Sequence, residues 1–350
     1  MRETQILPLV VIALVAALVS VVAMWSLDRS KQGVDLTKTV RGTDAFIEWK
    51  LVTTWPKGLP GLGAAPENFA RRVNEASGGR LRIKVFGAGE IVPPFEVFDA
   101  VSRRVAEAGH GASYYWKGKI PASVFYTAVP FGMTAQEANG WLHYGGGLEL
   151  WRELYAPFGV VPFAGGSTGV QMAGWFNKRL NNREDLAGLK MRIPGLAGEV
   201  FDAAGGSAVR IAGGEVYTSM QTGVIDAVEW VGPYNDRTLG LMEVGDYYYY
   251  PGWHEPGAML EIIVNEEALA ALPEDLQAIV TVAARATNSD MLDDFTAHNS
   301  ESLEILLRDF DMELLPLPDD VMDILYEESQ VAVQALIDAD PMAAKIAVSY

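Results

Sequence analysis

Cysteine is absent from the 350-residue chain, and histidine occurs only four times, at His110, His143, His254 and His298. The lack of cysteine excludes thiol nucleophiles, disulfides and cysteine-based zinc sites. No two histidines have metal-ligand spacing. The segment around His254 lacks the second histidine of a zinc-protease helix, and Pro256 would break such a helix.

Positive charge is also scarce, because 27 lysines and arginines face 45 acidic residues and the formal net charge is −18. This balance argues against binding to nucleic acid and gives no attraction to anionic lipid. An anionic small molecule would need a local basic group to hold it against the average field. The apolar content of 49% is sufficient for a buried core, and the length allows two domains of ordinary size.

An apolar run at 6–25 is interrupted only by Pro8 and Ser20. A signal-peptide core is about 7–15 residues long and a spanning helix about 20, so this run is at the long end. We expect residues 1–30 to be an export signal, either cleaved or retained as a membrane anchor, followed by a polar linker at 31–43. A buried core helix is disfavoured because the run is terminal and apolar on all sides. The remainder of the chain is then periplasmic.

Strand-like and helix-like patterns alternate along the rest of the chain. Strands or extended segments are predicted at 46–55, 81–86, 110–116, 159–178, 207–211 and 224–231. Helices are predicted at 66–77, 94–106, 196–204, 215–222, 273–284, 289–307 and 319–337. The pattern is typical of an α/β fold with mixed sheets flanked by helices. Two sets of strands joined by extended segments indicate two lobes, with a cleft between them that can bind a small ligand.

Two charged residues stand in apolar strand patterns. Arg192 ends a short strand that Pro194 terminates, and Glu229 belongs to the strand predicted at 224–231. Strand alternation places Glu229 on one face with three apolar residues, Ile225, Ala227 and Val231. An unpaired buried carboxylate is costly, so Glu229 needs a partner. A cation that is held together with an acidic ligand would be one such partner.

Long motifs surround these two residues: GLKMRIPG at 188–195 and GGEVYTSMQTGVIDAVEW at 213–230. Together they resemble the DctP-type solute receptors of tripartite ATP-independent periplasmic (TRAP) transporters. Further segments resemble the branch that binds 2-oxo acids such as pyruvate: ASYYWKGKIPA at 112–122, VPFGM at 129–133, EWVGPYND at 229–236 and YYYYPGWHEPG at 247–257. The resemblance covers residues 46–350.

The resemblance implies a two-lobed Venus-flytrap receptor without catalytic activity, which delivers a small organic acid to the membrane permease subunits. We expect lobe I to comprise 44–164 and 231–255, and lobe II to comprise 165–230 and 256–350 with the C-terminal helices. Ligand-driven closure would hinge at 165–171 and 229–231. The long C-terminal helix could mediate a homodimer.

The resemblance also implies roles for individual residues. Arg192 corresponds to the carboxylate clamp, since a guanidinium can grip a carboxylate through two parallel hydrogen bonds. Glu229, the carbonyl of Trp230 and the side-chain oxygen of Gln171 correspond to ligands of a cation, sodium or alternatively calcium. Gln171 would also contact the substrate. The alternative for Glu229 is an ion pair with a core arginine, and the alternative for Gln171 is a backbone hydrogen bond.

Other polar and aromatic residues are candidates for the substrate site. Tyr114 and Tyr115 follow a strand end, and one of them, preferably Tyr115, would donate a phenol hydrogen bond; the alternative is aromatic core. Candidate cleft walls are Trp230, Trp175 and Phe176. Candidates for polar lining or a helix cap are Asn235 and Asp236. His254 and Glu255 form a loop pair that could touch the ligand or the hinge.

The favoured function is capture of a small 2-oxo or 2-hydroxy monocarboxylate with a bound cation. A receptor for an aromatic acid, a sugar acid or a compatible solute is the alternative. An exported hydrolase would need Asp226 and Glu229 as paired carboxylates, but residues three apart on a strand point to opposite faces. A purely structural subunit would leave Arg192 and Glu229 unexplained.

Overall fold

The structure is a computed structural model that describes residues 46–350. The predicted export signal at 1–30 and the predicted linker at 31–43 both lie outside this range. In the described part of the chain, no helix has the length and apolar character needed to cross a membrane. Residues 46–350 form one compact unit.

The first lobe is built on a five-stranded sheet with the order β2-β1-β3-β10-β4. Its strands are β1 Ile47–Thr53, β2 Leu81–Phe86, β3 Ala108–Gly111, β4 Val160–Gly169 and β10 Ala258–Asn265. β1 is parallel to β2 and β3, whereas β10 is antiparallel to β3 and β4. The sheet is therefore mixed, and the carboxyl ends of β1 and β3 lie at the edge that faces the second lobe.

The second lobe contains a six-stranded sheet with the order β11-β9-β5-β8-β6-β7. Its strands are β5 Gly174–Phe176, β6 Lys190–Arg192, β7 Ser207–Val209, β8 Ala227–Val228, β9 Tyr247–Tyr250 and β11 Glu313–Pro316. β6 is parallel to β7 and β8, and β5 is antiparallel to β8 and β9. Both sheets are mixed and flanked by helices, as the sequence predicts.

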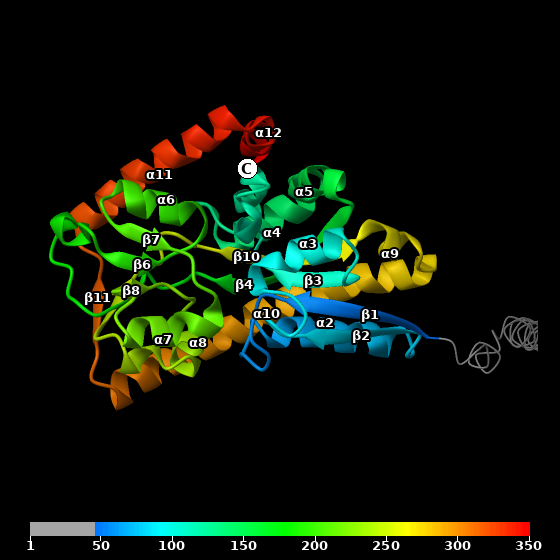
Figure 1. Cartoon of the computed structure of the whole chain (residues 1–350), viewed down its shortest axis with the longest axis horizontal. Helices are drawn as coiled ribbons and strands as arrows, with labels where there is room; N and C mark the ends of the chain where they lie inside the picture. Colours follow the sequence, from blue (N-terminus) through cyan, green and yellow to red (C-terminus); the bar gives the residue numbers. More distant parts are fainter. Residues whose placement is uncertain (1–45) are drawn as a thin grey trace, which may run out of the picture. The chain divides into compact units, whose positions relative to one another are not determined.

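The helices cover both sheets and join the lobes (Figure 1). They are α2 Ala64–Ala76, α3 Val97–Ser102, α4 Ala135–Tyr144, α5 Gly147–Tyr155, α6 Gly195–Ala203, α7 Val216–Gln221, α8 Pro233–Thr238, α9 Glu266–Ala270, α10 Glu274–Asp309, α11 Asp319–Ala339 and α12 Pro341–Ser349. The 36-residue α10 contacts α2 and β4 of the first lobe and α8 of the second. α11 packs on α6, and α12 returns to α5.

Several element boundaries differ from the sequence prediction. The helices predicted at 273–284 and 289–307 are one helix, α10, because no glycine or proline interrupts 274–309. The helix predicted at 94–106 ends at Ser102, and Arg104 then has a positive φ of 58°. The strand predicted at 224–231 is reduced to Ala227–Val228, so Glu229 lies just beyond it.

The predicted division into lobes differs from the observed sheets. β9 lies in the second sheet although 231–255 was expected in lobe I, and β10 lies in the first sheet although 256–350 was expected in lobe II. Strand crossovers decide these positions: the chain leaves the first sheet after β4 and returns through 251–257. The segment 229–231 joins β8 to α8 within the second lobe, so it is not a crossover between sheets.

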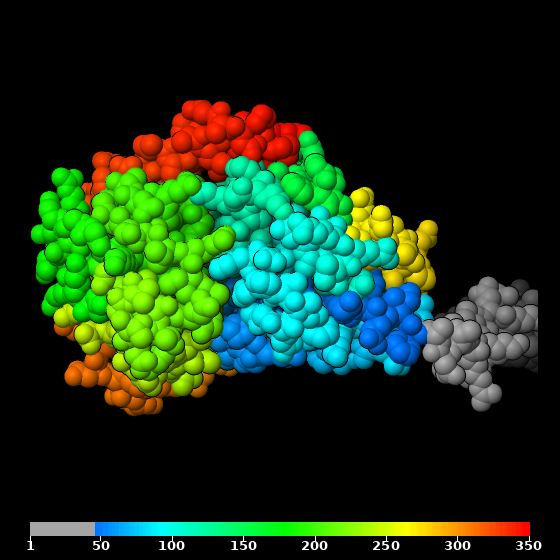
Figure 2. Space-filling model, viewed as in Figure 1, coloured from blue at the N-terminus to red at the C-terminus, as the bar shows by residue number. Residues whose placement is uncertain are grey.

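The two lobes are in contact along their shared boundary. Figure 2 shows blue and cyan atoms of the first lobe against green and yellow-green atoms of the second. Lys117, just after the 3₁₀ helix Ser113–Trp116, forms an ion pair with Glu199 of α6. Asn235 of α8 donates a 2.8 Å hydrogen bond to the carbonyl of Pro60. These contacts bring residues from both lobes around one buried site.

Candidate functional site

Arg192 is the central charged group of the lobe interface. It ends β6 and is only 1% exposed. Its Nε donates to the carbonyl of Ile211 at 3.2 Å, and its Nη1 donates to the carbonyl of Glu229 at 2.8 Å and to the Glu229 carboxylate. Its Nη2 donates to the Tyr115 hydroxyl at 3.2 Å. The parallel pairing of β6 with β8 sets Arg192 opposite Val228 and hence beside Glu229.

Glu229 is fully buried between two basic side chains. One carboxylate oxygen accepts from Arg192, and the other lies 3.0 Å from Nε2 of His254. The ion pair with a core arginine, which was the alternative reading of Glu229, is therefore present. Strand alternation does not explain the burial: Ala227, Val228, Glu229 and Trp230 are all buried. Helices pack on both faces of the second-lobe sheet, so side chains that point to either face are buried.

A second carboxylate adjoins this pair. Glu229, His254 and Glu255 offer ligand atoms within 4.8 Å of one another. Burial and then the nearby charge of Glu229 raise the pKa of Glu255 well above its usual value. Glu255 Oε2 accepts a 2.6 Å hydrogen bond from Nε2 of Gln171. The cluster therefore combines oxygen ligands of the type that hard cations bind.

Gln171 lies in the loop between β4 and β5, and not in the extended strand that the sequence predicts. Its Nε2 also donates to Thr168 Oγ1 at 3.1 Å, so its amide hydrogens go to side chains. Its Oε1 is buried and has no hydrogen-bond partner within residues 46–350. A buried acceptor without a donor costs about 1–3 kcal/mol. This atom therefore has the character of a ligand-binding group.

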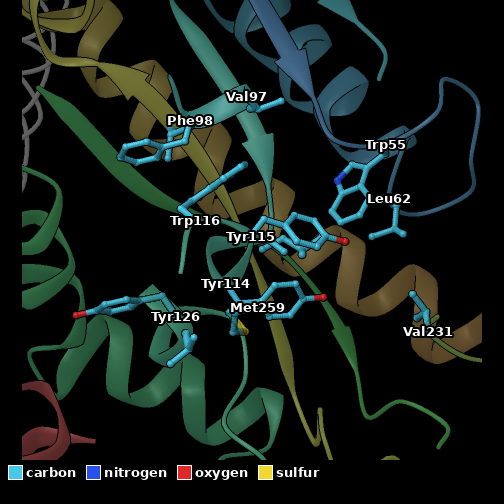
Figure 3. Close-up of a cluster of buried hydrophobic side chains, with 14 of the residues drawn as sticks. Trp55, Leu62, Val97, Phe98, Tyr114, Tyr115, Trp116, Tyr126, Val231 and Met259 are labelled. Carbon is cyan, nitrogen blue, oxygen red and sulfur yellow. The ribbon is translucent and has the colours of Figure 1, made fainter. Parts of the chain in front are cut away.

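Arg192, Gln171 and Glu255 line a small cavity of about 10 Å³, roughly the space of one water molecule. Its lining comprises Trp55, Leu62, Tyr114, Tyr115, Thr168, Gln171, Arg192, Trp230, Val231, Glu255, Ala258 and Leu260. In Figure 3, the hydroxyl groups of Tyr114 and Tyr115 point the same way, toward the side where Leu62 and Val231 lie. This volume is far below the roughly 300–1,000 Å³ typical of ligand pockets, so the lining side chains must move apart to admit a ligand. The polar part of the lining suits a small molecule with one acidic end.

The aromatic residues of the cavity come from both lobes. Tyr114 and Tyr115 lie in the 3₁₀ helix after β3, and burial raises the pKa of each phenol, so both remain hydroxyl donors. The Arg192 guanidinium lies over the Trp230 ring at 4.9 Å. The buried Nε1 of Trp230 has no acceptor in the part of the chain that is described.

Besides Glu229 and His254, four other candidates lie outside the cavity lining. Trp175 stacks on Tyr248 in the second-lobe core, with 4.1 Å between ring centroids. Phe176 packs in the apolar cluster behind that sheet. Asp236 accepts from the backbone of Val231 and Gly232 at the start of α8 and from Trp175 and Tyr248. Asn235 binds Pro60 across the lobes, while its Oδ1 is unpaired within the described range.

Three of the polar or aromatic lining residues are not singled out as site residues by the sequence: Trp55, Thr168 and Glu255. The sequence places Glu255 only in a loop pair with His254 that could touch the ligand or the hinge. Trp55 lies just after the carboxyl end of β1. Ligands of open α/β sheets bind at the carboxyl ends of the strands, so this position could have identified Trp55 as a site residue. Thr168 lies near the end of β4 and carries no comparable signal.

The arrangement is suited to binding rather than to catalysis. Glu229 is engaged by Arg192 and His254, and the Asp226 carboxylate accepts from the backbone of Lys190 at 3.0 Å. The two carboxylates therefore do not act as the flanking pair of a glycosidase. A guanidinium, two phenols and an unpaired amide oxygen can together hold a carboxylate and a neighbouring polar atom.

Comparison with known proteins identifies the class of the chain. A monocarboxylate 2-oxoacid-binding periplasmic protein from Nostoc sp. is 45% identical over 286 residues, which is 82% of this chain and 78% of the relative. A TRAP periplasmic solute-binding protein from Colwellia psychrerythraea, solved with calcium and pyruvate, is 42% identical, with a TM-score of 0.85 over 87% of this chain and 93% of that one.

A related protein from Pseudoalteromonas atlantica, solved with sodium and pyruvate, is 42% identical, with a TM-score of 0.84 over 87% of this chain and 92% of that one. These similarities confirm the predicted two-lobed receptor fold and exclude the hydrolase alternative, since these proteins are transport receptors. They are periplasmic, as expected for this chain. The model of the bacterial extracellular solute-binding proteins of family 7 matches residues 51–339, so the chain belongs to this DctP family of TRAP-transporter solute receptors.

Proposed function

We propose that this receptor captures a small 2-oxo or 2-hydroxy monocarboxylate such as pyruvate, together with a cation, and delivers it to the permease subunits of a TRAP transporter. The observation that carries the proposal is the buried Arg192–Glu229 pair, whose arginine lines a small cavity. The relatives supply the ligand class: one is named as a 2-oxoacid-binding protein, and two were solved with pyruvate.

The charges explain why the acid and the cation bind together. A ligand carboxylate that takes hydrogen bonds from Arg192 competes with the Glu229 carboxylate for the same guanidinium. Glu229 then needs another positive partner, because a buried carboxylate without one is costly. A cation beside Glu229 supplies that charge and can also bind the carboxylate and keto oxygens of a 2-oxo acid.

The donor set fits such a cation. Glu229 supplies a carboxylate oxygen, Gln171 supplies the amide oxygen that has no partner in residues 46–350, and Trp230 supplies a backbone carbonyl. Sodium and calcium both accept all-oxygen sites. Arg192 and a phenol, with Tyr115 favoured over Tyr114, would hold the acid. Asn235 has no place in this scheme except to join the lobes.

Titration calorimetry with pyruvate in sodium, in calcium and in a buffer free of both tests the proposal. We expect pyruvate to bind in at least one of the two cation buffers. In the buffer without sodium and calcium, its affinity should be lower by at least about tenfold. Equal affinity in all three buffers would refute the cation requirement. Binding of an aromatic or sugar acid in place of any 2-oxo or 2-hydroxy acid would refute the ligand class.

Arg192→Gln should remove binding, because the amide cannot replace the paired guanidinium donors. The matched control is Arg179→Gln, since Arg179 is an exposed arginine of the same lobe that pairs with Glu313. We expect the control to bind as the unmodified protein does. Retained affinity in Arg192→Gln would show that the carboxylate binds elsewhere.

A further inference from the structure

A fully buried histidine of the first lobe lies behind the cavity without lining it. His110 belongs to β3, is 0% exposed and pairs with Thr53 of β1 and Ile262 of β10. Its Nδ1 accepts a 2.9 Å hydrogen bond from Nε1 of Trp55. Because the indole nitrogen can only donate, Nδ1 carries no proton and Nε2 carries it.

The other ring nitrogen is fixed by an irregularity of the sheet. His110 Nε2 lies 3.2 Å from the carbonyl of Gly165, to which it donates. In the pairing of β10 with β4, Glu261 is opposite Ala164 and Leu260 is opposite Gly166, so Gly165 is the extra residue of a β-bulge. The bulge leaves this carbonyl free for the imidazole. A Cβ at Gly165 would lie 2.4 Å from the Ile262 nitrogen, so the bulge requires glycine.

Trp55, the other partner of His110, is a wall of the cavity. Its ring lies 6.0 Å from Tyr115 and 6.2 Å from Trp230 between centroids, with an 84° angle to Trp230. The Trp55 ring therefore packs between Tyr115 of the first lobe and Trp230 of the second. Figure 3 shows it beside Tyr115 and Leu62. A rotation of this indole would widen the cavity on the first-lobe side.

We propose that His110 is a positioning residue that sets the size selectivity of the acid site, by locking the Trp55 indole between Tyr115 and Trp230. The inference rests on the proposed function and deepens it. The bulge at Gly165 holds the imidazole, the imidazole holds the indole, and the indole excludes acids with longer side chains. Burial lowers the pKa of His110 to about 4, so the imidazole stays neutral in neutral solution.

The substitution series compares two acids on each variant: pyruvate and the branched 2-oxo acid derived from leucine. His110→Leu removes the acceptor, so we expect the preference for pyruvate to fall roughly tenfold, the range for a buried hydrogen bond. His110→Asn places an amide oxygen near the former Nδ1 position. We expect it to restore at least about half of the loss in the logarithm of the affinity ratio between the two acids. Trp55→Phe keeps a ring but lacks the donor and should resemble His110→Leu.

The matched control is His143→Leu, on α4 and outside the cavity lining, where the same substitution should leave the preference unchanged. An unchanged preference in His110→Leu and Trp55→Phe, or equal losses for both acids, would overturn the inference. If His110→Leu does not fold, Trp55→Phe and His110→Asn decide the outcome by the same ratio.

A measurement without ligand separates this inference from the proposed function. Nitrogen-15 NMR of the histidines should show one ring with an unprotonated Nδ1 and a protonated Nε2, and Trp55→Phe should shift that signal. A protonated Nδ1 at His110 would overturn the inference even if pyruvate binds. Failure of the unmodified protein to bind any 2-oxo acid would instead refute the proposed function, whatever the tautomer, and with it the stated selectivity.

Discussion

Arg210 of the second lobe donates a 3.1 Å hydrogen bond to the backbone carbonyl of Tyr115 in the first lobe. Its guanidinium also lies over the Phe95 ring at 4.3 Å. The hydroxyl of the same tyrosine accepts from Arg192. Two arginines of one lobe therefore hold both ends of Tyr115: Arg192 belongs to the cavity lining and Arg210 lies outside it.

Arg210→Gln should weaken ligand binding without changing its cation dependence. The side chain is exposed, so its loss should raise the dissociation constant only about threefold to tenfold. The reason is that Arg210 stabilises closure but does not touch the cavity, so the effect should reside mainly in the dissociation rate. Stopped-flow dissociation measures it, with Arg179→Gln as control. A change confined to the association rate would contradict the prediction.

Substitutions of Arg192 and Glu229 should affect folding stability and ligand binding differently. Removing one partner leaves the other charge buried, so Arg192→Met and Glu229→Leu should each lower the free energy of unfolding by about 3–5 kcal/mol. In the double variant no unpaired charge of this pair remains, and most of that loss should be recovered. Urea unfolding measures stability, and calorimetry should find no pyruvate binding in any of the three variants.

Two outcomes would contradict this prediction. Additive losses in the double variant would mean that the two side chains do not interact as an isolated pair, and the hydrogen bond of Glu229 to His254 would then dominate. Retained binding in the double variant would mean that neither charge holds the ligand.

Arg192 and Glu229 could be found from the sequence because each is a charge in an apolar pattern within a long motif. Their proximity could not be derived from strand alternation. It follows from the parallel pairing of β6 with β8, two strands more than thirty residues apart along the chain. The sequence alone leaves the partner of Glu229 open, and the structure provides two, Arg192 and His254.

His110 and Trp55 illustrate what local patterns cannot provide. Their hydrogen bond depends on the parallel neighbours β1 and β3, and the second bond of His110 depends on a bulge in β4, on the far side of β10. The placement of β9 and β10 in opposite sheets was also mispredicted. Crossover connections are set by packing of whole elements, which short-range periodicity does not encode.

The buried carboxyl of Glu261 should make stability depend on pH. Burial raises its pKa to about 8, although Trp116 and Tyr155 both donate to it. The folded state therefore keeps the proton while the unfolded state loses it near the ordinary value of 4.5. The contribution of Glu261 is full below that value and is lost as the pH rises toward about 8.

Glu261→Gln tests this dependence because the amide resembles the protonated carboxyl and cannot ionise. We expect the difference in unfolding free energy between the variant and the unmodified protein to grow in favour of the variant from about pH 5 to pH 8. Urea unfolding at several pH values measures it. Glu313→Gln, at an exposed position, is the control, and a pH-independent difference would contradict the prediction.

Gly213 and Gly214 offer a matched test of the second-lobe wall. A Cβ at Gly213 would lie 2.2 Å from the Trp230 ring, whereas nothing lies within 4 Å of a Cβ at Gly214. Gly213→Ala must therefore displace the indole that lines the cavity, which should lower pyruvate affinity roughly tenfold or more, within the range of about 1–3 kcal/mol for overpacking. Gly214→Ala should bind normally. Calorimetry on the two variants measures the difference, and equal affinities would show that Trp230 does not define the ligand site.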